Sequence, residues 1–188
     1  MIRLFIVLVI CSFAFSGCSQ KNLYVIETEI GDIKFQVYPD KVPITVKNFE
    51  RYVENGDFTG ATFYRVVRMD NQPNDSIRIE VIQGNFIQGD KSFEAIEHET
   101  TNNTGVLHKD GAISMARRDP GSAAAAFFIC VNDQPELDFG GKRNPDGQGF
   151  AAFGDVVEGM DVVRQIQSGA TDHQTLKKPI VIKSIRKL

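Results

Sequence analysis

Short β-rich runs separated by turn residues fill most of this chain, and they limit its fold more than any other feature of the sequence. The runs are residues 23–28, 33–38, 62–67, 77–82, 112–116, 127–131, 150–157 and 180–185. Only two segments, 42–53 and 160–166, place apolar residues at helical spacing. Many short strands with two isolated helices are typical of an antiparallel barrel. The sequence therefore predicts a mainly β fold in which the helices cap the ends of the barrel.

Turn residues mark where several of these elements end. Gly31 and Asp32 separate the first two runs and predict a hairpin. Pro43 suits the first turn of the helix over 42–53, and Gly56 suits its C-terminal stop. The polar, turn-rich segment 68–76 predicts an exposed excursion between two strands.

Length and charge limit the organisation of the chain and its partners. With 188 residues, the chain is long enough for one domain and too short for two ordinary ones. Hydrophobic residues make up 42% and charged residues 24%, which is typical of a globular protein. The formal net charge of -3 gives no electrostatic reason to expect nucleic acid as a partner.

The first 22 residues differ from everything that follows. Arg3 precedes an apolar stretch over 4–15 that is too short to span a bilayer and is followed by small residues. The sequence Phe15-Ser16-Gly17-Cys18 resembles the bacterial lipobox, with Phe15 where leucine is usual. We therefore expect a lipoprotein signal peptide over 1–17, a lipidated Cys18, a tether over 18–22 and a single domain over 23–188. The alternatives are a plain signal peptide cut near Cys18 and a buried N-terminal helix.

The three cysteines are consistent with an exported lipoprotein. Cys11 leaves with the signal peptide, and Cys18 carries the lipid. Cys130 lies alone inside an apolar run and is expected to be a small buried hydrophobe. No disulfide can then form within one mature chain.

No motif for a metal, a nucleotide or a nucleophilic triad stands out. His98, His108 and His173 fit no metal-binding spacing, and we expect them to be surface or capping residues. The Gly147-Gln148-Gly149 segment precedes a predicted strand rather than a helix, which is the wrong context for a phosphate-binding loop.

Three stretches, in this order along the chain, resemble the cyclophilins. They are Gly31-Asp32-Ile33-Lys34-Phe35 with Tyr38-Pro39-Asp40-Lys41-Val42-Pro43; Thr62-Phe63-Tyr64-Arg65-Val66-Val67; and Gly111-Ala112-Ile113-Ser114-Met115-Ala116-Arg117 with Phe127-Phe128-Ile129 and Phe153-Gly154-Asp155-Val156-Val157-Glu158-Gly159-Met160. The resemblance covers nearly all of residues 23–188. It implies an eight-stranded antiparallel barrel capped by two helices, in agreement with the pattern of short strands.

The resemblance also implies an activity. A cyclophilin-like chain would be a peptidyl-prolyl cis-trans isomerase, which accelerates rotation about X-Pro bonds in exported or unfolded proteins. It would act by electrostatic stabilisation of the twisted amide, without a metal or a cofactor. Arg65 is identified by its place in the match as the catalytic cation, because arginine stays charged and offers a rigid fork of donors.

A glutamine accompanies the arginine in the family, and two positions fit it. Val81-Ile82-Gln83-Gly84 and Phe86-Ile87-Gln88-Gly89 both resemble the same segment. We take Gln83 as the second catalytic residue and keep Gln88 as the alternative, with Phe86 able to restore an aromatic wall to the substrate pocket.

The match further implies an apolar pocket for the proline ring. Phe128 would form its floor, and Leu137 and Phe150 would form its walls. Ala116 is another substrate-binding candidate. The alternative role for each of these side chains is ordinary core packing.

Several departures from the family pattern keep a second function open. Ala126 stands where many cyclophilins have a glutamine that binds the substrate backbone, and Glu136 stands where tryptophan is frequent. With Gln83 as the match, the family's Phe-Met pair falls at Glu80 and Val81. The alternative function is a catalytically weak peptide-binding or assembly module on the same barrel, and a third is a structural envelope lipoprotein.

Partners and location follow from the same features. We expect a monomer that binds proline-containing polypeptides and attaches to the membrane through its N-terminal lipid. The expected location is the extracytoplasmic side of a bacterial cell envelope. Ser19, in place of an acidic residue after Cys18, favours the outer membrane.

Overall fold

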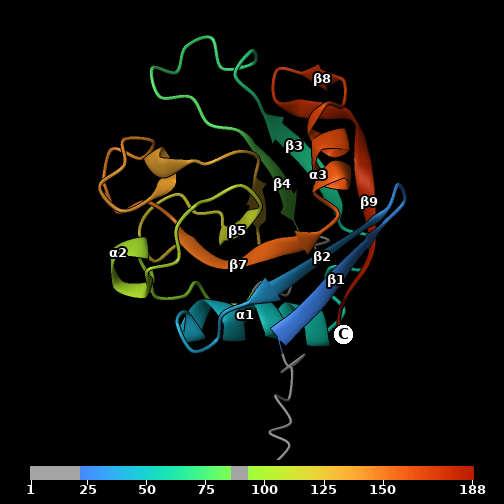
Figure 1. Ribbon diagram of the computed structural model, residues 1–188, viewed down its shortest axis with the longest axis horizontal. Coiled ribbons are helices and arrows are strands. Elements are labelled where there is room, and N and C mark those ends of the chain that lie inside the picture. The colour runs from blue at the N-terminus through green and yellow to red at the C-terminus, as the bar shows by residue number, and fades with distance from the viewer. Residues whose placement is uncertain (1–21, 86–92) are drawn as a thin grey trace, which may run out of the picture.

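The computed structural model of the chain describes residues 22–85 and 93–188 (Figure 1). Its strands are β1 Leu23–Thr28, β2 Asp32–Val37, β3 Thr62–Val67, β4 Val81–Asn85, β5 Ala112–Met115, β6 Phe127–Cys130, β7 Ala151–Glu158, β8 Thr171–Asp172 and β9 Thr175–Lys187. Its helices are α1 Pro43–Glu54, α2 Thr101–Thr104 and α3 Met160–Gln167, with a 3-10 turn at Pro135–Leu137. None of the helices in these ranges has the length and apolar character needed to cross a membrane.

The strands form a closed antiparallel barrel, as the sequence predicts. Eight of them follow one another around it in the order β1, β2, β7, β5, β6, β4, β3 and β9, and β9 pairs again with β1. β8 lies outside this ring and pairs with β9. The predicted hairpin is also confirmed, because Glu27 of β1 pairs with Asp32 of β2.

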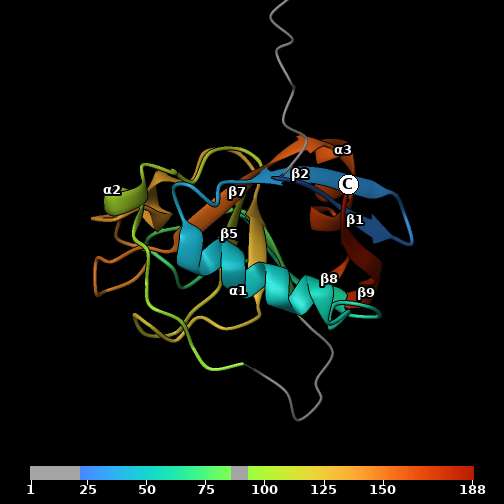
Figure 2. The same cartoon turned by 90° about the horizontal axis from the view of Figure 1, so that it is seen from below.

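Both predicted helices are present and cover the barrel from different sides. α1 packs against β7 and β9, whereas α3 packs against β2, β3 and β4. Figure 2 shows α1 lying along one face of the molecule, below β7 and β5. Pro43 is in the first turn of α1, as predicted, and the carboxylate of Glu99 accepts hydrogen bonds from the N–H groups of Ile44 and Thr45 at 3.2 and 2.8 Å.

Two strands begin several residues away from their predicted starts, and the one-turn helix α2 and the short strand β8 were not predicted. β4 begins at Val81 rather than residue 77, because side chains bind the backbone upstream of it: Gln72 binds the N–H and the carbonyl of Ile79, and Arg143 donates to the carbonyl of Ile77. β9 begins at Thr175 rather than residue 180 and continues through Pro179, near a shift in its register with β3.

Two hydrophobic clusters lie on opposite faces of the same strands. The larger fills the barrel and contains Phe127 and Ile129 of β6, while the smaller lies outside and contains Phe128 and Cys130. Successive side chains of a strand point to opposite faces, so all four residues are buried only because both faces are covered. The prediction that Cys130 is a buried hydrophobe is confirmed.

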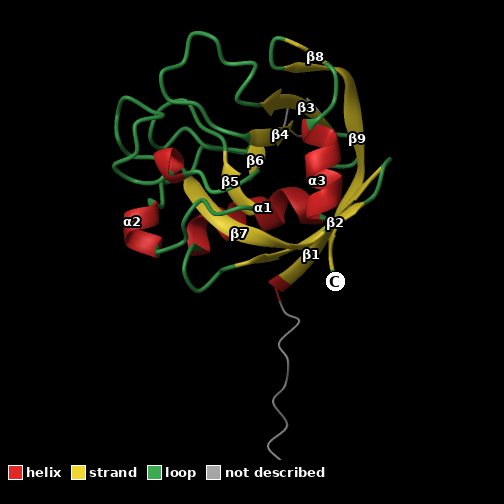
Figure 3. Cartoon of the chain, turned by 45° about the horizontal axis from the view of Figure 1, so that its top comes forward, coloured by secondary structure: helices red, strands yellow, loops and turns green. Residues whose placement is uncertain are grey.

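Loops cover the outer face at β3, β4, β5 and β6. Figure 3, coloured by secondary structure, shows most of the loops gathered on this side of the molecule, away from β1 and β2. They include the excursion between β3 and β4 and the loop between β6 and β7.

The barrel interior is centred on Phe49 of α1. Its ring lies 5.1–6.2 Å from those of Tyr24, Phe35, Phe58, Phe127 and Phe153, measured between centroids. We expect Phe49→Ala to lower the free energy of unfolding by about 3–5 kcal/mol, because it removes a buried ring and leaves a cavity.

Urea denaturation followed by circular dichroism measures this change. The matched control is Phe139→Ala, at a residue that is 47% exposed, where we expect a change of less than about 1 kcal/mol. Similar losses in both variants would contradict the central place of Phe49.

Candidate active site

A shift in strand register brings Arg65 and Gln83 side by side. β3 and β4 pair antiparallel, but the register slips between Phe63 and Arg65, so that Arg65 lies opposite Gln83. Such irregularities re-aim side chains in a sheet. The Nη1 group of Arg65 donates to Oε1 of Gln83 at 2.7 Å. Of the two glutamines that the sequence left open, Gln83 is thus beside Arg65, while Gln88 and Phe86 lie outside the described residues.

Tyr64 fixes the orientation of Gln83. The Nε2 group of Gln83 donates to the hydroxyl oxygen of Tyr64 at 2.8 Å, so its Oε1 turns toward Arg65. Burial raises the pKa of the Tyr64 hydroxyl, which keeps it neutral at ordinary pH.

A second glutamine, Gln174, holds the other side of the guanidinium. Its Oε1 accepts hydrogen bonds from Nε of Arg65 at 3.0 Å and from Nη2 at 2.6 Å. No pattern in the sequence pointed to Gln174, since it lies 109 residues from Arg65 in a turn that was not predicted as a hairpin.

Arg65 carries its charge in a partly buried place. Burial lowers the pKa of its guanidinium, which nevertheless stays charged because arginine titrates far above neutrality. Asp75 is near enough to favour this charge, but it forms its ion pair with Arg143 at 2.9 Å. Among the described residues, the direct partners of Arg65 are therefore neutral amides.

A cavity of about 220 Å³ opens next to Arg65 and Gln83, with Arg117, Arg143 and Asn144 also in its lining and apolar side chains on its floor and walls. It contains four of the predicted substrate-binding side chains together with two aliphatic ones from β4 and the segment before it: Phe128, Leu137, Phe150, Ala116, Ile79 and Val81. The ring of Phe150 meets that of Phe128 edge to face, with 5.3 Å between centroids. The predicted floor and walls thus surround one hollow.

The family's aromatic Phe-Met pair falls at Glu80 and Val81 in this chain, and the cavity wall there is aliphatic. Val81 lines the cavity, as does Ile79. Glu80 does not line it, and its carboxylate accepts a hydrogen bond from Nδ2 of Asn132 at 2.8 Å. Alternation along an extended chain explains this difference, because Glu80 lies between Ile79 and Val81, which both belong to the outer cluster beside the cavity.

The floor of the cavity rests on a buried histidine. His108 stacks on the ring of Phe128 at 5.9 Å, and its Nδ1 and Nε2 atoms lie 2.7 Å from Asp138 and 2.9 Å from Ser114. The expectation of a surface or capping histidine is wrong for His108, which is only 1% exposed. The trio has the atom types of a hydrolytic triad, but Ser114 is fully buried and no substrate can reach its hydroxyl.

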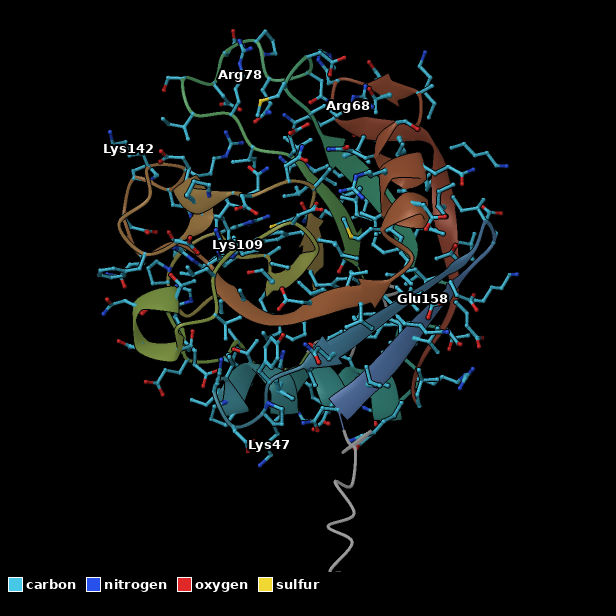
Figure 4. The ribbon with its side chains drawn as sticks, in the orientation of Figure 1. Lys47, Arg68, Arg78, Lys109, Lys142 and Glu158 are labelled. Atoms are coloured by element: carbon cyan, nitrogen blue, oxygen red, sulfur yellow. The ribbon has the colours of Figure 1, made fainter. Side chains whose placement is uncertain are left out.

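Two arginines tie the long loops to the rim of the cavity. Arg143 binds Asp75 and the carbonyl of Ile77, which joins the loop between β6 and β7 to the excursion between β3 and β4. Arg117 makes two bonds to the carboxylate of Asp146 at 2.8 and 2.9 Å, which lowers the pKa of Asp146 to about 2. Figure 4 shows Arg78 and Lys142 on the outer edges of these two loops.

A second, more open hollow of about 670 Å³ continues from the first. The two share Gln83, Ala116 and Arg117, and the second is bordered by the small residues Ala124, Ala125 and Ala126. Together they form a groove in which an extended peptide can lie. Among the described residues, no cluster of three or more His, Cys, Asp or Glu side chains could hold a metal ion.

This arrangement can bind an apolar ring beside a fixed positive charge. A cation held by neutral partners favours a state in which a nearby atom gains electron density, and it does so without a covalent step. The cavity has room for a small ring, and the groove that continues from it has room for an extended peptide chain.

Comparisons with known proteins agree with this geometry. Residues 23–187 match the family model described as cyclophilin type peptidyl-prolyl cis-trans isomerase/CLD. The chain is 36% identical over 167 residues to peptidyl-prolyl cis-trans isomerase B of Escherichia coli, which covers 84% of this chain and 94% of the relative. It is 35% identical over 170 residues to a peptidyl-prolyl cis-trans isomerase of Acinetobacter baylyi, which covers 85% and 82%.

Solved structures share the fold. A cyclophilin type isomerase of Cryptosporidium parvum superposes with a TM-score of 0.70 at 20% identity, covering 87% of this chain and 95% of that chain. A second structure of that protein, in the presence of the dipeptide Ala-Pro, gives a TM-score of 0.68. The family match over nearly the whole domain, the two bacterial relatives and the shared barrel lead to one conclusion: the chain belongs to the cyclophilin-type peptidyl-prolyl cis-trans isomerases.

Proposed function

We propose that the protein isomerises X-Pro bonds in exported or unfolded polypeptides by stabilising the twisted amide with the charge of Arg65. The observation that carries the proposal is a guanidinium held by two neutral amides beside a cavity whose floor and walls include Phe128, Leu137 and Phe150. The Ala-Pro dipeptide in the solved structure of the Cryptosporidium parvum relative supports a proline-containing peptide as the ligand.

The mechanism follows from the electronic structure of the amide. Resonance sets a barrier of roughly 18–20 kcal/mol to rotation about a peptide bond. In the twisted transition state the prolyl nitrogen loses conjugation and becomes a better hydrogen-bond acceptor. The proline ring would occupy the cavity over Phe128, so that this nitrogen lies near Arg65. The cation then stabilises the twisted state more than either planar state, and only such a difference lowers the barrier.

We further propose that the protein is a monomeric lipoprotein of a bacterial cell envelope. The lipobox-like sequence that ends in Cys18 supports attachment through acyl chains, and Ser19 supports the outer membrane. More than one acyl chain gives stable membrane attachment, and this attachment supplies location rather than chemistry.

One observation favours a second candidate, a peptide-binding module with little turnover. Ala126 borders the groove where many cyclophilins have a glutamine, which leaves fewer side-chain donors for the substrate backbone. Such a module would bind X-Pro peptides without accelerating their isomerisation.

We expect Arg65→Ala to lower kcat/KM by about 10²–10³-fold, the usual loss when a preorganised donor to a transition state is removed. Arg65→Lys keeps the charge but loses the planar fork, and we expect a loss of about tenfold or more. NMR exchange spectroscopy on a short Ala-Pro peptide, with the full chain in detergent, measures the rate.

The matched control for these variants is Arg186→Ala, which removes an exposed arginine bound to Glu27 and leaves activity unchanged. Thermal unfolding checks that all variants fold. Wild-type turnover in Arg65→Ala would contradict the mechanism. Peptide binding by the wild type without cis-trans exchange would favour the binding module.

The anchor makes a separate prediction. Mass spectrometry of the mature N-terminus should find a diacylglyceryl group on Cys18, and Cys18→Ser should release the protein from the membrane fraction, because no thiol remains to carry the lipid. Cys11→Ser is the control, since that residue leaves with the signal peptide. A mature N-terminus without lipid rules out the anchor, and density-gradient fractionation of the two membranes tests the preference for the outer one.

A further inference from the structure

Gln174 lies directly beside Arg65 because of a tight turn. The turn joins β8 to β9, with Asp172 paired to Thr175, and His173 adopts a positive φ of 53°. The carbonyl of Gln174 accepts a hydrogen bond from the N–H of Val66 at 2.9 Å, so its backbone is fastened to the strand that carries Arg65. Figure 1 shows this turn beside the excursion between β3 and β4.

The side chain of Gln174 hydrogen-bonds to one edge of the Arg65 guanidinium. Its Oε1 accepts from Nε at 3.0 Å and from Nη2 at 2.6 Å, while Gln83 accepts from Nη1 at 2.7 Å. Arginine has five N–H donors, and these contacts use three of them. The other two, one on each terminal nitrogen, have no partner within residues 22–85 and 93–188. The guanidinium is thus fixed on two sides and keeps donors for a ligand.

The acceptor that Gln174 supplies is uncharged, so the contact orients the guanidinium and leaves its positive charge in place. A carboxylate would bind the same pair of donors more strongly, but it would also offset the positive charge. Asp75, the acid whose field reaches Arg65, is paired with Arg143 instead. We propose that Gln174 is a positioning residue that fixes the direction of the Arg65 guanidinium without neutralising it. The inference rests on the proposed function of Arg65.

The excursion between β3 and β4 supports this contact. Nδ2 of Asn71 donates to the carbonyls of Val66 and His173 at 3.1 and 3.2 Å, which joins the excursion to the turn. Nε2 of Gln174 donates to the carbonyl of Asn71 at 3.4 Å. That bond sets the orientation of the Gln174 amide, with its oxygen toward Arg65 and its nitrogen away.

Two substitutions separate position from charge. Gln174→Met keeps the length of the side chain but removes the acceptor, and Gln174→Glu keeps the acceptor but adds a negative charge. We expect each to lower kcat/KM by about tenfold, with the Kd of the same Ala-Pro peptide within about twofold, because Arg65 acts mainly on the transition state. Matched controls are Gln165→Met and Gln165→Glu at an exposed position of α3, where neither constant changes.

A merely structural role for Gln174 predicts a different order of kcat/KM among the variants. If Gln174 only braced the turn, Gln174→Glu would be benign, since a carboxylate bonds the guanidinium more strongly. Wild-type kcat/KM in Gln174→Glu, or in Gln174→Met, therefore overturns the proposal. So does a loss of activity in which peptide affinity and thermal stability fall together.

A spectroscopic readout keeps the positioning role separate from the proposed function. If the wild type shows no exchange activity, the proposed function fails, and the contact is then tested by the Nε–H signal of Arg65 in ¹⁵N NMR spectra. Arg65→Lys, which lacks this group, identifies the signal. We expect slow exchange with water in the wild type and in both Gln165 variants, and fast exchange in Gln174→Met. Persistence of the slow signal in Gln174→Met overturns the proposal.

Discussion

Burial of the same strands on both faces is the constraint on which this structure depends. Phe127 of β6 points into the barrel, and the adjacent Phe128 points out to the cavity floor. Because a strand alternates its side chains, the register that packs the barrel core also sets which residues face the cavity. Gly84 of β4 belongs to this arrangement, since a side chain there would lie 3.1 Å from the ring of Phe127. Core and site are therefore specified by one pattern of residues.

The outer layer turns this strand surface into a site. Loops on either side of the cavity are joined through Arg143 and held by Arg117, whose side chain is almost fully buried over the ring of Phe150. These two cations have carboxylate partners, whereas the partners of Arg65 are glutamines. Arginine thus joins loops in two places, while in the third its positive charge is not offset by an acid, and the charge of the partner makes the difference.

The sequence predicted those parts of the molecule that local pattern determines. Alternating and apolar runs indicated the barrel, and separate stretches of the resemblance to the cyclophilins led to Arg65, Gln83 and Phe128. Gln174 could not be predicted, because its only marker is a contact with a residue 109 positions away. His108 was misjudged for a similar reason: a histidine is buried when distant groups satisfy both ring nitrogens, and Asp138 is 30 positions away. The start of β4 was misplaced since side chains from two loops occupy the backbone that the pattern assigned to a strand.

The closure of the barrel also brings the two ends of the domain together. The N–H of Leu188 donates to the carbonyl of Leu23 at 2.9 Å, where β9 pairs with β1. In Figure 1 this rim lies at the bottom beside α1, and the excursion between β3 and β4 lies at the top. A bead, a sensor surface or a fusion partner joined at either end would therefore leave the cavity accessible to large chains. Cargo could be attached at both ends at once without crossing the groove.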